Sequence, residues 1–124
     1  MNAEPQTLKL LADLGEQLSA VLEKEFSALV EKNLDLLESL QSQKVELLSQ
    51  IETTWQGYDA ETSSEQDALQ EVRVLMADCK DKHIRNDLLL RRQMETVKNL
   101  LATLTSQSAE RFGDVYNKLG RMKR

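Results

Sequence analysis

Apolar residues recur at helical spacing through the first half of the chain. From Leu11 to Trp55 they cover 44 residues in 12 steps, or about 3.7 residues per step, which is typical of a helix and not of a strand. The positions are Leu11, Leu14, Leu18, Leu22, Phe26, Leu29, Leu34, Leu37, Leu40, Val45, Leu48, Ile51 and Trp55. We predict a helix over about 6–56, after Pro5 and before Gly57. The segment EKNLD around Asn33 is where we expect this helix to break or bend, because Asn and Asp side chains offer the backbone competing hydrogen bonds.

The second half shows a sharper pattern. Residues 57–64 are polar and predict a loop, and Ser64 followed by Asp67 predicts a capping box that starts a helix over about 65–110. The stripe of this helix covers 35 residues in 10 steps, a spacing of 3.5, which is the heptad repeat of helices that wrap around one another. Its positions are Leu69, Val72, Met76, Cys79, His83, Asn86, Leu90, Met94, Val97, Leu101 and Leu104.

These elements predict an all-α fold in a single domain over 1–124. A short loop between long helices indicates a long antiparallel helical hairpin, or a coiled-coil-like bundle of two or three helices. The composition agrees, because aromatic residues make up only 4% of the chain, charged residues make up 30%, and there is one Pro. The tail over 111–124 carries apolar side chains with no evident place in the hairpin, so we predict that it binds a partner.

Charge is spread unevenly along the chain. The net charge is −5; residues 1–60 hold 11 acids and 4 bases, whereas residues 61–124 hold 10 acids and 12 bases. The two halves therefore attract each other, and the overall sign disfavours nucleic acid as a partner. Arg85, Arg91, Arg92 and Lys98 form either a phosphate-binding stripe or a solvated face that pairs with the acidic first helix, and we favour the second interpretation.

The chain is expected to be cytoplasmic. Its first residues lack the basic and apolar segments of a signal peptide, and no run approaches the roughly 20 apolar residues of a membrane span. One Cys cannot form an internal disulfide bond, which fits a reducing compartment.

Cys79 and His83 are the only Cys and His of the chain, and their spacing places them on one face of a helix. A zinc site needs about four ligands, and the sequence has no further Cys or His to supply them. A thiol nucleophile needs an oxyanion hole in a pocket, and the sequence shows no sign of one. We therefore expect no metal, no cofactor and no enzymatic activity, although a thiol or metal enzyme remains an alternative. Cys79 is interpreted as a small apolar filler. We interpret His83 and Asn86 as polar residues that fix helix register.

Three segments resemble the FlgN family of flagellar type III export chaperones. EKNLDLLESLQSQKVELLSQI, residues 31–51, is similar to the Leu-rich stretch of the family, with Lys44, Leu47 and Leu48. CKDKHIRNDLLLRRQ, residues 79–93, resembles its Cys/Asn signature, although His83 and Asp87 stand where the family usually has Asn and Gly. VYNKLGR resembles the ending of the family, with matching Tyr and Gly residues at Tyr116 and Gly120.

The resemblance implies a cytosolic chaperone without ATPase activity. Such proteins hold hook–filament junction proteins of the FlgK and FlgL type and deliver them to the export gate protein FlhA, and Tyr116 is the residue that would dock on the gate. A client helix would lie on the apolar positions of the C-terminal half, in a helix-in-groove mode. We predict the contact residues Val97, Leu100, Leu101, Leu104 and Phe112. The alternative is a structural or adaptor coiled coil that forms a homo-oligomer through the same stripes.

Overall fold

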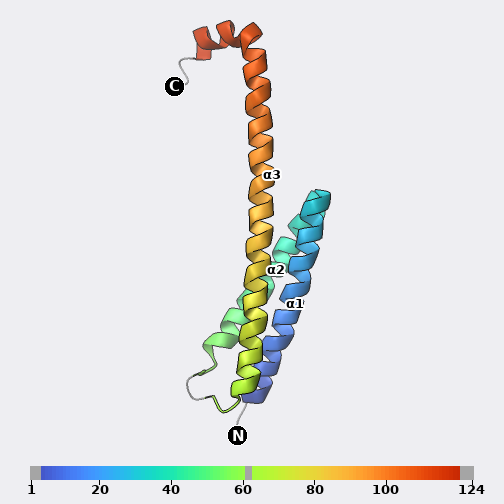
Figure 1. Cartoon of the computed structure of the whole chain (residues 1–124). Helices are drawn as coiled ribbons and strands as arrows, with labels where there is room; N and C mark the ends of the chain where they lie inside the picture. The colour runs from blue at the N-terminus through green and yellow to red at the C-terminus, as the bar shows by residue number, and fades with distance from the viewer. Residues whose placement is uncertain (1–3, 61–62, 121–124) are drawn as a thin grey trace. The chain divides into compact units, whose positions relative to one another are not determined.

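The computed structural model describes residues 4–60 and 63–120, and its side chains are described as far as Ser106. The fold is all-α, as predicted, with α1 over Glu4–Glu31, α2 over Leu34–Gln56 and α3 over Gln66–Gly120 (Figure 1). The chain comprises two compact units: residues 1–88, called unit 1, and residues 89–124, called unit 2. Unit 1 contains α1, α2 and the first part of α3, and unit 2 continues α3 alone.

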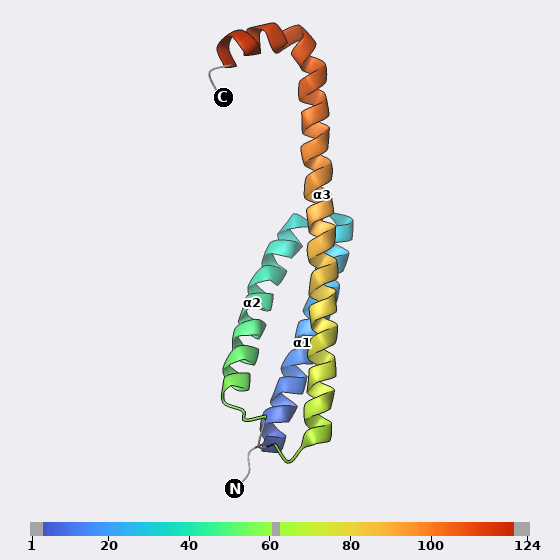
Figure 2. The same cartoon turned by 60° about the vertical axis from the view of Figure 1, so that its left-hand side comes forward.

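The turn between α1 and α2 is built by Lys32 and Asn33. Lys32 has a φ of 59°, and the amide N–H of Asn33 donates to the carbonyl oxygen of Ala28 at 2.9 Å, which is the Schellman arrangement that ends a helix. Asn33 then caps α2, because its side-chain oxygen accepts from the amide of Leu36 at 3.1 Å. The predicted helix over 6–56 is therefore two helices, and α2 runs back along α1 (Figure 2).

The core of unit 1 is a seam of leucines from all three helices. Its buried apolar members are Leu8, Leu11, Leu14, Leu18, Val21, Leu22, Ala28, Leu29, Leu40, Leu47, Leu69, Val72 and Cys79. At Gly15, an added Cβ would lie 2.7 Å from Cδ2 of Leu75, so the glycine lets α1 and α3 approach closely.

The predicted stripe of α2 is wrong at Leu34, Val45, Leu48 and Trp55, whereas Leu37 and Ile51 pack against the core. Val45 and Leu48 are exposed, whereas Leu40, Lys44 and Leu47 are buried. Lys44 and Leu47 continue the buried face of Leu40 at four- and three-residue spacing, whereas the predicted step of five residues from Leu40 to Val45 turns the stripe off that face. The predicted boundary of α3 also differs, since the helix extends to Gly120 instead of ending near residue 110.

The loop before α3 is held by Glu4. Its carboxylate accepts hydrogen bonds from the hydroxyl groups of Tyr58, Ser63 and Ser64 and from the amide of Ser64. The hydrogen bond from Ser63, followed by that from Tyr58, lowers the pKa of Glu4 to about 2. Ser64 therefore donates hydrogen bonds to Glu4 of α1. It does not form the capping box that we predicted with Asp67.

The E4Q variant is expected to lose part of the pH dependence of stability. Because the folded pKa lies near 2 and the ordinary value is 4.5, the contribution of the Glu4 carboxylate is complete above about pH 4.5 and is lost as the pH falls toward 2. Urea unfolding near neutral pH and near pH 3 measures this effect. Wild type should lose more stability on acidification than E4Q does, with the exposed substitution E38Q as control. Equal losses in wild type and E4Q would contradict the assigned role of Glu4.

Candidate partner-binding surface

The heptad stripe of α3 changes from buried to exposed along the helix. In unit 1 it packs in the core, where Leu69 is 1% exposed and Val72 is 3% exposed. In unit 2 the same spacing brings Met94, Val97 and Leu101 to the surface at 63%, 55% and 57% exposure. A sustained heptad stripe is typical of a helix that packs against another helix. Over the described side chains of unit 2, the stripe has no such cover.

Four of the predicted contact residues lie together on one face of α3, and three of them belong to this stripe. Val97, Leu100, Leu101 and Leu104 are all exposed, and they follow the i, i+3, i+4, i+7 spacing that gathers side chains on one face of a helix. We call these four residues the α3 apolar face. The other three predicted residues, Phe112, Tyr116 and Gly120, lie in the part of α3 whose side chains are outside the described residues.

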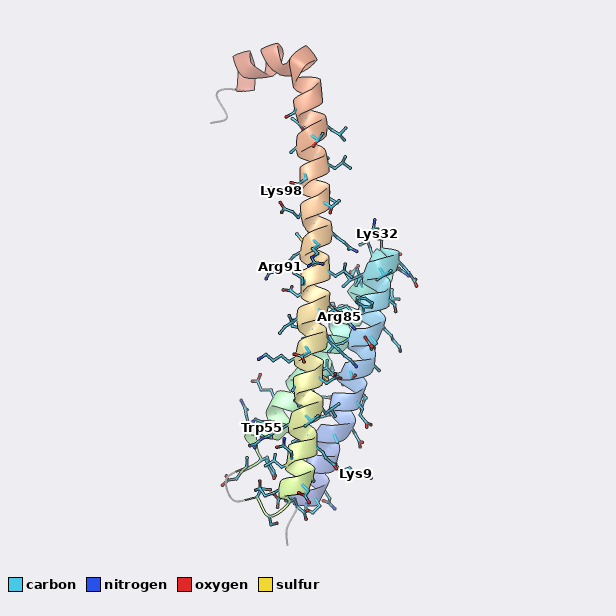
Figure 3. The ribbon with its side chains drawn as sticks, in the orientation of Figure 1. Lys9, Lys32, Trp55, Arg85, Arg91 and Lys98 are labelled. Carbon is cyan, nitrogen blue, oxygen red and sulfur yellow. The ribbon has the colours of Figure 1, made fainter. Side chains whose placement is uncertain are left out.

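Basic residues outnumber acidic residues in the part of α3 that carries the α3 apolar face. Residues 89–106 contain three basic residues, Arg91, Arg92 and Lys98, and one acidic residue, Glu95. Their net charge is +2. Figure 3 labels Arg91 and Lys98 on this part of the helix. A partner helix with an acidic flank therefore matches the surface better than a basic one.

Arg85 pairs with the acidic first helix, as the interpretation of a solvated face requires. Its guanidinium lies 2.6 Å from Oε1 of Glu23 and 4.0 Å above the ring of Phe26 on α1 (Figure 3). The hydrogen bond from Arg85 lowers the pKa of Glu23. Arg85 is therefore engaged within unit 1, which favours a solvated face over a phosphate-binding stripe at this residue.

A buried polar cluster joins the three helices of unit 1. Asn86 donates from Nδ2 to the carbonyl oxygen of Leu22 and to Oε1 of Glu25, both at 2.8 Å, and Nζ of Lys44 donates to Oε2 of Glu25 at 2.8 Å. Glu25 and Lys44 are each only 7% exposed. The arrangement is compatible with the register role that we predict for Asn86, since a shift of α3 would separate these partners.

Glu25 and Lys44 were missed in the sequence analysis, although a signal exists. Glu25 falls at a three- and four-residue spacing between Leu22 and Leu29, and Lys44 falls at the same spacing between Leu40 and Leu47. Two opposite charges at heptad core positions of successive helices indicate a buried ion pair.

Cys79 and His83 differ in their burial. Cys79 is buried and its Sγ donates to the carbonyl oxygen of Gly15 at 3.4 Å; burial raises the pKa of its thiol, which disfavours the nucleophilic thiolate. The side chain of His83 is exposed, so our prediction that it lies in the helix seam is wrong. Within the described ranges, no group of three or more metal-ligating side chains is suitable for holding a metal ion.

Comparison with known proteins gives no match to a family model, a curated protein or a solved structure. Nor does any helix within residues 4–60 and 63–120 have an apolar stretch long enough to cross a bilayer. The evidence for function is therefore the α3 apolar face, the net positive charge of residues 89–106 and the motifs in the sequence.

Proposed function

We propose that the chain is a cytoplasmic export chaperone of the FlgN type, which binds hook–filament junction proteins of the FlgK and FlgL type and delivers them to the export gate protein FlhA. The observation that carries this proposal is the exposed α3 apolar face. A client helix would cover Val97, Leu100, Leu101 and Leu104 with its own apolar side chains. The resemblance of the three sequence segments supplies the identity of the client and of the gate.

The energetics of such a contact suit a carrier. Burying each of the four side chains contributes about 1.5 to 3 kcal/mol, and part of this gain is offset by the ordering of the client and by lost translational freedom. The remainder gives reversible binding. A chaperone that must release its client at the gate needs this reversibility, and it needs no catalytic group.

The second candidate is a structural or adaptor coiled coil that forms a homo-oligomer through the same face. The heptad spacing of α3 favours it, because this spacing suits packing between identical helices. The charges of residues 89–106 oppose it, since two copies would bring together segments of net charge +2. Light scattering of the full chain and of a variant truncated after Ser108 separates the candidates: a tight oligomer that needs no tail favours the scaffold.

The Y116A variant is expected to retain client binding and to lose capture by the gate. This prediction follows from the resemblance, which assigns gate docking to Tyr116 and client binding to other residues. Pulldown of the full chain with a FlgK- or FlgL-type client and, separately, with the cytoplasmic part of FlhA measures both interactions. The neighbouring substitution N117A serves as control. A Y116A variant that still captures the gate would show that Tyr116 does not dock there.

A further inference from the structure

Unit 1 has an open groove between α2 and α3. One hollow of about 240 Å³ is lined by Leu18, Leu22, Lys44, Leu48, Ile51, Met76, Cys79, Lys80 and His83. A second, of about 360 Å³, is lined by Leu11, Ile51, Trp55, Val72, Arg73 and Met76. The two hollows share Ile51 and Met76 as lining residues, and together they are called here the unit 1 groove. Its floor is α1, which Figure 2 shows between α2 and α3.

The α2 side of the unit 1 groove is apolar and exposed. Leu48 and Trp55 line the groove and remain exposed, and Val45 lies one turn before Leu48 on the neighbouring surface. Figure 3 shows Trp55 near the end of α2. From Val45 to Trp55 the apolar side chains extend over roughly 15 Å of helix, which is enough to contact about three turns of a partner helix.

The α3 side of the unit 1 groove is basic. Arg73 and Lys80 are seven residues apart on one face, and His83 follows Lys80 by three residues. Among the described residues, neither Arg73 nor Lys80 has a hydrogen-bond or ion-pair partner. By contrast, Lys82, on the α1 side of α3, binds Asp78 and Ser19. A chain with a net charge of −5 thus leaves two bases unpaired beside an apolar groove.

We propose that the unit 1 groove binds one amphipathic helix of a partner protein, with apolar side chains in the groove and acidic side chains beside Arg73 and Lys80. Charge selects this occupant. A second copy of α3 is a poor occupant of the groove. Its residues 89–106 carry a net charge of +2 and would be repelled by the basic α3 side of the groove. This site is formed by residues of unit 1, none of which belongs to the α3 apolar face, and it does not depend on the function proposed above.

Trp55 makes the proposal directly measurable, because it is the only Trp of the chain and it lines the groove. The probes are two synthetic peptides of about 18 residues, the length at which an isolated helix becomes stable. Both carry Leu at three- and four-residue spacing; one has Glu on its flanks and the other has Lys. On titration into the full chain, the Glu peptide is expected to shift the Trp55 emission to shorter wavelength. The Lys peptide should bind at least about tenfold more weakly.

Charge reversal of the α3 side tests the proposed orientation. The R73E/K80E variant is expected to exchange the preference, so that the Lys peptide binds more tightly than the Glu peptide. The control is K9E/K24E, which makes the same change in net charge at exposed positions of α1 that do not line the groove. This control should keep the wild-type preference.

Three results would overturn the proposal. The first is equal binding of both peptides to wild type. The second is an unchanged preference for the Glu peptide in R73E/K80E, or a change of preference of the same size in the control K9E/K24E. The third is a concentration-dependent emission shift without peptide, together with dimer formation in light scattering, which would show that a second copy occupies the groove.

The triple variant V97S/L101S/L104S should leave the Trp55 response intact, so failure of the function proposed above is distinguishable from failure of the groove proposal.

Discussion

The K44A variant is expected to lower the free energy of unfolding of unit 1 by about 3 to 5 kcal/mol. Lys44 is the cationic partner of Glu25, and both side chains are buried. Its removal leaves the Glu25 carboxylate in the core with Asn86 as its other hydrogen-bond partner and without a compensating charge. Urea unfolding followed by far-ultraviolet circular dichroism measures the loss.

The double variant E25M/K44M provides the matched control. Replacing both charges with apolar side chains of similar length removes the desolvation cost together with the attraction, so we expect stability close to that of wild type or above it. Asn86 keeps its hydrogen bond to the carbonyl oxygen of Leu22 in this variant. A loss below about 1 kcal/mol in K44A, the range of surface pairs, would contradict the account of a buried ion pair.

The V97S/L101S/L104S variant is expected to weaken client binding by about 100-fold or more. Each substitution removes an apolar side chain that a client helix would cover, and a combined loss of about 3 kcal/mol corresponds to about two decades in Kd. Because all three side chains are exposed, the stability of unit 1 should not change. Calorimetric titration of a FlgK- or FlgL-type client into the full chain gives the affinity, and thermal unfolding gives the stability.

The control for this variant replaces exposed apolar residues elsewhere. Val30, Val74 and Ile84 are exposed to a similar extent and lie outside the α3 apolar face. V30S/V74S/I84S should bind the client as wild type does. If both triple variants lose affinity equally, binding depends on general surface hydrophobicity and not on the α3 apolar face.

The sequence was sufficient to predict the fold class and most of the α1 core. Leu11, Leu14, Leu18, Leu22 and Leu29 were placed on one stripe by their spacing, and all five are buried. This success has a physical reason, because a helix must bury a continuous apolar face and that face is encoded by local spacing.

The buried face of α2 was misassigned because Lys44 was left off the stripe, whereas the exposure of α3 was beyond the sequence pattern. In α2, the buried position is Lys44 and not its apolar neighbour Val45, because a charge on another helix, Glu25, satisfies it there. In α3, Leu69 and Leu104 occupy equivalent heptad positions of one stripe, yet Leu69 is buried and Leu104 is exposed. Spacing specifies which face a residue occupies, whereas burial depends on whether a neighbouring helix is present.

The central claim, that the α3 apolar face is a recognition surface covered by a client, is tested most directly by hydrogen–deuterium exchange of the full chain with and without a FlgK- or FlgL-type protein. In the free chain, backbone amides of residues 94–104 should exchange quickly, and those of residues 69–86 should exchange slowly because their helix is packed in the core. In a one-to-one complex, exchange at residues 94–104 should become slow. Unchanged exchange at residues 94–104 in the complex, or full protection there in the free monomer, would contradict the account.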